Sequence, residues 1–171
     1  MFKKLLLIIT STILLSSIGF SQFNSVYAEG GGAGLLFSLN YERMLTDNIS
    51  VRVGYGSASA EEEGHEGHSH GDEGDGKITF IPIGANYLIG SGNNKLTVGG
   101  GMTMVNTTME YELGSLSLDA NFPYASAGYR YQRGTGGLYM SFSGYAFFIK
   151  DLITEETTML PWGGFSFGWT F

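Results

Sequence analysis

From residue 22 onward, apolar and polar residues alternate with a period of two, the pattern of a β-strand with one apolar and one polar face. The clearest case is 163–171, where three aromatic residues and the terminal Phe171 alternate with Gly, Ser and Thr. Six further segments alternate in the same way: 35–42, 49–56, 81–89, 96–104, 124–132 and 138–148. None of these segments is an uninterrupted apolar run long enough for a membrane-spanning helix.

The apolar faces carry the large aromatic and aliphatic residues, whereas the other faces carry Gly, Ser, Thr, Asn and an occasional Arg or Glu. A water-soluble sandwich would pack its aromatic face inward. The small, polar face suits the interior of a narrow barrel, so the apolar face is expected to contact lipid. Strands of this kind are typical of a transmembrane β-barrel, whose closure satisfies every backbone hydrogen bond.

The connections between these segments alternate in length. Short, turn-rich connections lie at 46–48, 90–94 and 133–136, and longer ones at 58–76, 106–119 and 150–159. Outer-membrane barrels have short periplasmic turns and longer extracellular loops, which directs the last strand toward the periplasm.

Seven strands would be an odd number, and bacterial single-chain barrels have an even one. An additional strand is therefore expected over 24–29, before the Gly30–Gly32 turn region. The sequence predicts an all-β, eight-stranded antiparallel up-and-down transmembrane β-barrel with a side-chain-filled interior and no wide channel.

The N-terminus has the layout of a secretory signal peptide. Two Lys precede the apolar run 5–20, and 19–21 offers small residues at the positions that a signal peptidase reads. A cut after Ser21 gives a signal peptide over 1–21 and a barrel domain over 22–171. A second acceptable cut follows Ala28, but it would remove the strand that the even count requires.

Four stretches, NSVYAE at 24–29, LNYER at 39–43, GYRYQ at 128–132 and PWGG at 161–164, resemble a family of small outer-membrane β-barrel proteins of the Bacteroidetes type. The resemblance covers nearly the whole mature chain. It implies a barrel fold and a place in the cell outer membrane, and it carries no catalytic residues. The terminal Phe171 resembles the C-terminal signal that the barrel-assembly machinery reads, so that machinery and outer-membrane lipid are the expected partners.

Composition excludes several other classes. The chain has no Cys, which rules out disulfides and thiolate metal sites. Its net charge of −7 and pI near 4.8 argue against a nucleic-acid partner. With 27 Gly among 171 residues it carries more than twice the usual share of about 7%. Nothing in it predicts an oligomer, and we expect a monomer.

Charged residues on the predicted polar faces are the first candidate site. Glu42 and Arg52 flank the 46–48 turn at nearly equal separations, and opposed residues of a hairpin lie ~5 Å apart at Cβ. We predict a lumenal ion-pair network of these two residues with Arg130, joined by Asn40 or Asn86. The network is either interior filling or a gate for small ions.

Six aromatic residues near the predicted strand ends are expected to anchor the barrel at the membrane interfaces. They are Tyr41, Tyr55, Tyr87, Trp162, Trp169 and Phe171.

The predicted extracellular loop 58–76 is acidic and holds all three His of the chain. His65, His68 and His70, with Glu66 or Asp72, could bind a divalent metal weakly. The alternative is a solvated loop whose seven carboxylates repel other molecules from the rim.

No catalytic residues are assigned. Every His lies in this loop, away from the strands that could hold a base against a nucleophile, and no nucleotide-binding fingerprint is present. We expect a non-enzymatic outer-membrane barrel with a structural or surface-interaction role and no cofactor beyond a weakly bound metal. The alternatives are metal capture through the His loop and a lipid-modifying enzyme.

Overall fold

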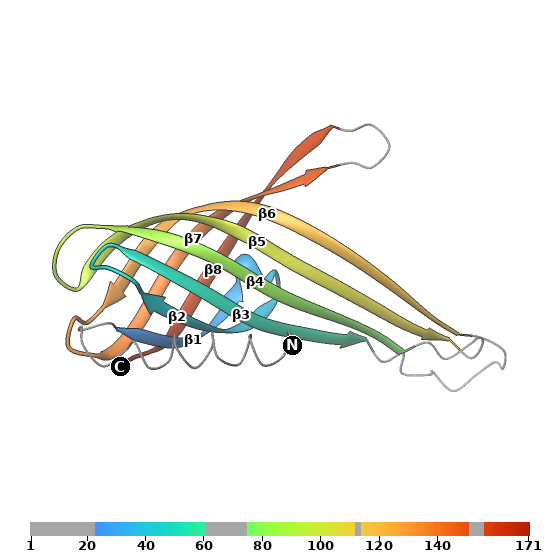
Figure 1. Ribbon diagram of the computed structural model, residues 1–171, viewed down its shortest axis with the longest axis horizontal. Coiled ribbons are helices and arrows are strands. Elements are labelled where there is room, and N and C mark those ends of the chain that lie inside the picture. The colour runs from blue at the N-terminus through green and yellow to red at the C-terminus, as the bar shows by residue number, and fades with distance from the viewer. Residues whose placement is uncertain (1–22, 61–74, 112–113, 151–155) are drawn as a thin grey trace, which may run out of the picture.

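The computed structural model describes residues 23–60, 75–111, 114–150 and 156–171 (Figure 1). The predicted signal peptide and the five metal candidates (His65, His68, His70, Glu66 and Asp72) lie outside these residues. Within them, no helix has the length and hydropathy needed to cross a bilayer.

Eight strands form a closed barrel in which each strand pairs antiparallel with its neighbours along the chain and β1 closes on β8. The predicted eight-stranded up-and-down barrel is confirmed. The strands are β1 (Asn24–Gly31), β2 (Phe37–Met44), β3 (Ile49–Ala60), β4 (Asp75–Ile89), β5 (Asn94–Tyr111), β6 (Gly114–Gln132), β7 (Gly137–Lys150) and β8 (Thr157–Thr170), with the 3₁₀ turn η2 (Gly32–Gly34) between β1 and β2.

The alternation sorts side chains between two environments, as β8 shows. Phe165, Phe167 and Trp169 point outward and are 41%, 54% and 61% exposed, whereas Ser166 and Thr170 point inward and are buried. An apolar exterior of this kind would be unfavourable in water, because exposed apolar surface costs about 25 cal/mol per Å². It is compatible with contact to hydrocarbon.

The interior contains more than small and polar residues. Six large aromatic side chains are buried in it: Tyr27, Phe80, Tyr124, Tyr139, Tyr145 and Phe147. Inward-facing glycines make room for them. A Cβ added at Gly84 or Gly101 would overlap the Tyr124 hydroxyl group. The lack of a side chain at these glycines therefore leaves the space that the inward-pointing tyrosine occupies.

The two ends of the barrel differ. The connections 45–48, 90–93 and 133–136 are short and lie at one end, called here the short-turn end, together with residue 23 and the C-terminal residue. Backbone bonds of 2.8 Å between Asn24 and Phe171 tie the two chain segments together there.

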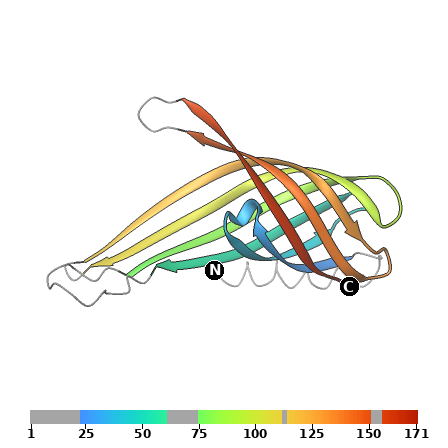
Figure 2. The ribbon, with the colours of Figure 1, turned by 180° about the vertical axis from the view of Figure 1, so that it is seen from behind.

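At the other end the sheet divides into two arms (Figures 1 and 2). Pairing of β6 with β7 stops at Tyr124 and Phe147, while β5–β6 and β7–β8 pairing continues to the ends of those strands. One arm is therefore the sheet β3–β6 and the other is the β7–β8 hairpin. On the outward face of the larger arm, polar residues such as Ser57, Lys77 and Asn106 replace the apolar ones.

Candidate functional site in the barrel lumen

Four charged side chains converge in the lumen. The period of two places Glu29 of β1, Glu42 of β2, Arg52 of β3 and Arg130 of β6 on inward faces, and each is at most 8% exposed. Charges buried this deeply require partners, because their desolvation is costly. The structure shows two ion pairs among the described residues, and each charged residue belongs to one of them.

The first ion pair joins Arg130 to Glu42. Arg130 Nη1 lies 2.7 Å from Glu42 Oε1 and Nη2 donates to Oε2 over 3.0 Å, while Nε and Nη1 make no hydrogen bond to a described residue. The hydroxyl groups of Ser50 and Tyr27 also donate to this carboxylate. The guanidinium lies 5.1 Å from the centre of the Tyr139 ring, which itself stacks on Tyr27. Glu42 is thus a fully engaged, ionised acceptor.

The second ion pair joins Arg52 to Glu29, with Nη1 3.2 Å from Oε1. The Tyr145 hydroxyl donates to the same oxygen over 2.7 Å. The guanidinium lies 5.8 Å from the Tyr124 ring centre and 5.7 Å from that of Tyr145. Arg52 Nη1 also lies 3.4 Å from the Tyr27 hydroxyl oxygen, and this contact links the two ion pairs into one network.

The pairing differs from the expected one. Glu42 and Arg52 are direct register partners on β2 and β3, but each forms its ion pair with another residue. The lumen is narrow enough for side chains to reach across it, so Arg130 of β6 reaches Glu42. Glu29 was missed, because the poor alternation of 24–29 did not reveal which residues face inward.

Neither of the two alternative amide members, Asn40 or Asn86, joins the charges. Asn40 Nδ2 donates to Ser38 Oγ over 2.9 Å. In the described part of the chain, no hydrogen bond connects Asn40 or Asn86 to the four charged residues. The network is completed by tyrosines instead, a residue type that was not expected there.

The turn η2 closes the lumen toward the end with the two arms. Ala33 is fully buried against Tyr124, Tyr145 and Phe147, and Thr103 Oγ1 donates to its carbonyl over 2.6 Å. Gly32 has a φ of +64°, and a Cβ there would overlap the Glu29 carboxylate. The glycine is therefore required both by the turn and by the ion pair beneath it.

One predicted anchoring residue lies on the inward side. Trp162 is the register partner of the inward Tyr145 but is 41% exposed, and its indole donates to the Leu35 carbonyl over 3.0 Å. Trp162 therefore fixes the segment that follows η2. The other five predicted anchors are exposed on the outward side, between 40% and 61%.

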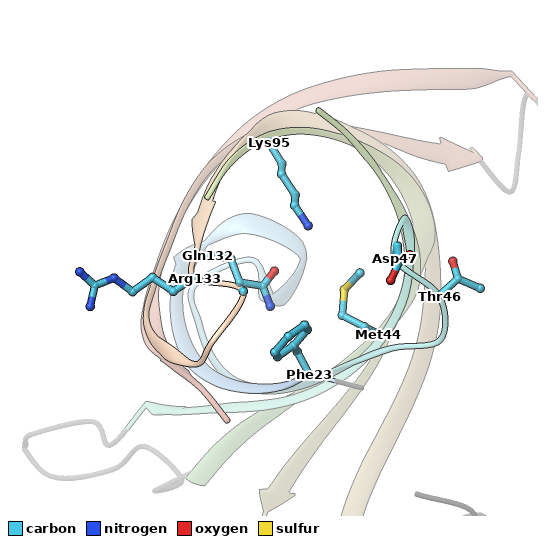
Figure 3. A pocket seen from close by; sticks show the side chains of 8 residues that line it. Phe23, Met44, Thr46, Asp47, Lys95, Gln132 and Arg133 are labelled. Atoms are coloured by element: carbon cyan, nitrogen blue, oxygen red, sulfur yellow. The ribbon is translucent and has the colours of Figure 1, made fainter. Parts of the chain in front are cut away.

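A cavity of about 210 Å³ lies at the short-turn end and is called here the vestibule (Figure 3). Lys95, Gln132, Met44 and Phe23 point into it, whereas Arg133 points away from the barrel. The complete lining is Phe23, Met44, Thr46, Asp47, Lys95, Gln132, Arg133 and Gly134.

The predicted metal ligands in 58–76 lie outside the described residues. Among the residues that are described, no group of three His, Asp or Glu side chains is arranged to hold a metal ion.

Comparisons with known proteins show which solved structures have a similar fold. No protein-family model matches the chain, and no curated protein matches its sequence. The chain is similar to the N-terminal β-barrel domain of Pseudomonas aeruginosa OprF, with 16% identity, a TM-score of 0.54 and coverage of 88% of this chain and 96% of that one. It is also similar to Ail, the attachment invasion locus protein of Yersinia pestis, solved in complex with the heparin analogue sucrose octasulfate. The identity is 13%, the TM-score is 0.50, and the match covers 88% of this chain and 95% of that one. The chain has the closed eight-stranded fold of small outer-membrane barrels.

Proposed function

We propose that the protein is a non-enzymatic outer-membrane barrel that acts as a closed scaffold and presents its two arms at the cell surface. The observation that carries this proposal is that side chains fill the lumen, while several strands continue beyond it as the two arms. The lumenal charges engage one another and η2 covers them. Strands β5 and β6 have 18 and 19 residues, whereas about 9–11 residues cross a bilayer.

The apolar exterior supports outer-membrane lipid as the principal partner. A barrel that closes on itself leaves no unpaired strand edge within the apolar band, which favours a monomer. The resemblance to Bacteroidetes barrels remains part of this proposal, as does reading of the last strand, ending at Phe171, by the barrel-assembly machinery.

Orientation in the membrane can be tested with single cysteines, since the chain contains none. Ser117→Cys lies on the larger arm and Ser91→Cys in a short turn. We expect a membrane-impermeant maleimide to label Ser117→Cys in intact cells, and to label Ser91→Cys only after the outer membrane is permeabilised. The reverse pattern would overturn the orientation, and equal labelling of both in intact cells would overturn the membrane location.

A closed scaffold should not conduct ions. The purified barrel is expected to give no sustained conductance steps in planar lipid bilayers, because the paired charges and η2 occupy the lumen. An established porin inserted in the same bilayers is the positive control. Reproducible steps from this protein would favour the ion-gate alternative over the scaffold.

A further inference from the structure

The charges on the inward faces of the barrel strands do not balance. Glu29, Glu42, Arg52 and Arg130 form two neutral pairs. Lys95 is a fifth inward charge, since it is the register partner of the inward Arg130 and points into the vestibule in Figure 3. In the described part of the chain its ammonium has no ion pair. The side chains on the inward faces of the strands therefore carry one positive charge in excess, while Asp47 lies on the exposed turn at the mouth of the vestibule.

The position of Lys95 makes this charge unfavourable without a ligand. Like charges directly opposite each other on paired strands are destabilising. Arg130 is neutralised by Glu42, and that carboxylate is already fully engaged. Lys95 thus adds a cation beside a neutral pair, in a partly enclosed space where charges interact more strongly than in water. An anion entering the vestibule would remove this imbalance.

The walls of the vestibule add an apolar component. Phe23 and Met44 project into the cavity beside Lys95. The carboxamide oxygen of Gln132, a residue 5% exposed, accepts no hydrogen bond from any described residue. Asp47 lines the same mouth, and it would repel a second negative charge on a ligand.

We propose that the vestibule binds a small organic anion. Its acidic group contacts the Lys95 ammonium, and its short apolar part packs on Phe23 and Met44. A carboxylate or a phosphate ester supplies this chemistry. Because Asp47 disfavours doubly charged groups, a monocarboxylate binds more tightly than an alkyl phosphate. The site opens to the periplasm and is independent of the arms that carry the surface role.

The binding experiment uses the refolded barrel in a nonionic maltoside detergent, which introduces no charged headgroups. Butanoate, butyl phosphate, acetate and 1-butanol are titrated while the backbone amide signals of Lys95 and Gln132 and the Met44 methyl signal are followed by NMR. Saturable shifts are expected with butanoate, weaker binding with butyl phosphate and acetate, and none with 1-butanol. Tighter binding of butyl phosphate would reassign the ligand to the phosphate class. Equal responses to butanol and butanoate would overturn the proposal.

Two variants of matched charge separate the site from general electrostatics. Lys95→Met removes a cation that points into the vestibule, and Lys77→Met removes an exposed one from the outward face of the larger arm, away from the vestibule. We expect Lys95→Met to weaken butanoate binding at least about tenfold, and Lys77→Met to change it by less than about twofold, because exposed charges are screened. Lys95→Arg should retain binding.

Equal weakening by Lys95→Met and Lys77→Met would overturn the assignment to Lys95. If Lys95→Met does not form the barrel, the wild-type titration decides, because the shifts at Lys95, Gln132 and Met44 either saturate with butanoate or fail to.

Discussion

Replacing Phe165 by Arg is expected to lower the unfolding free energy of the barrel in lipid by about 2–4 kcal/mol. Phe165 points outward and packs on Phe142 of β7, with ring centres 4.8 Å apart. It lies six residues above Phe171, which at ~3.3 Å per residue and a tilt of ~40° is roughly 15 Å from the short-turn end. The guanidinium would therefore lie near the middle of the hydrocarbon.

The measurement is reversible denaturant unfolding in phospholipid vesicles. Phe165→Leu controls for lost aromatic packing, and Ser57→Arg places the same charge on the outward face of β3 above the apolar band. Ser57→Arg should change stability by no more than about 0.5 kcal/mol. A barrel whose outer surface met water would tolerate both arginines equally, so equal effects would contradict a lipid-facing exterior.

Strand faces were predictable wherever the two faces of a strand differ strongly. On β8 the outward residues are aromatic and the inward ones are Gly, Ser and Thr, so the period of two identifies both environments. On β1 the pattern is weak, since the outward Ala28 and Gly30 are small while Tyr27 and Glu29 fill the interior. That strand was found by counting, and its inward glutamate was missed.

Partners across the lumen could not be predicted from hairpin spacing. The register of Glu42 with Arg52 follows from the short turn between β2 and β3, and the structure has that register. Which charge pairs with which depends on the barrel diameter and on the tyrosines between them. The inward fold of η2 is likewise a property of the closed barrel, because the space that Ala33 occupies is formed by strands far apart in the sequence.

The lumenal network behaves as one unit in the structure, since Tyr27 contacts both Glu42 and Arg52. The charges of the network pair inside the barrel, and the outer surface of the barrel carries apolar side chains. The apolar exterior and the charged interior are therefore independent halves of the same arrangement, and each is tested by its own substitution.

Glu42→Gln is expected to lower the unfolding free energy by about 3–5 kcal/mol, the cost of leaving a buried charge without its partner. The substitution keeps the side-chain shape but leaves the Arg130 guanidinium, 3% exposed, without a counter-charge beside the cation of Lys95. Asp47→Asn makes the same charge change at the exposed mouth and should cost less than about 1 kcal/mol.

A double-mutant cycle identifies the cause of that loss. Arg130→Met alone removes the cation and leaves Glu42 buried and unpaired, so it should also be strongly destabilising. In the double variant neither charge remains, and its loss should fall short of the sum of the two single losses by about 2 kcal/mol or more. Because these side chains lie in contact at 2.7 Å, their effects cannot be independent if the ion pair exists. Additive losses in vesicle unfolding would show that Glu42 and Arg130 do not pair, and that the stability of the lumen comes from its aromatic packing.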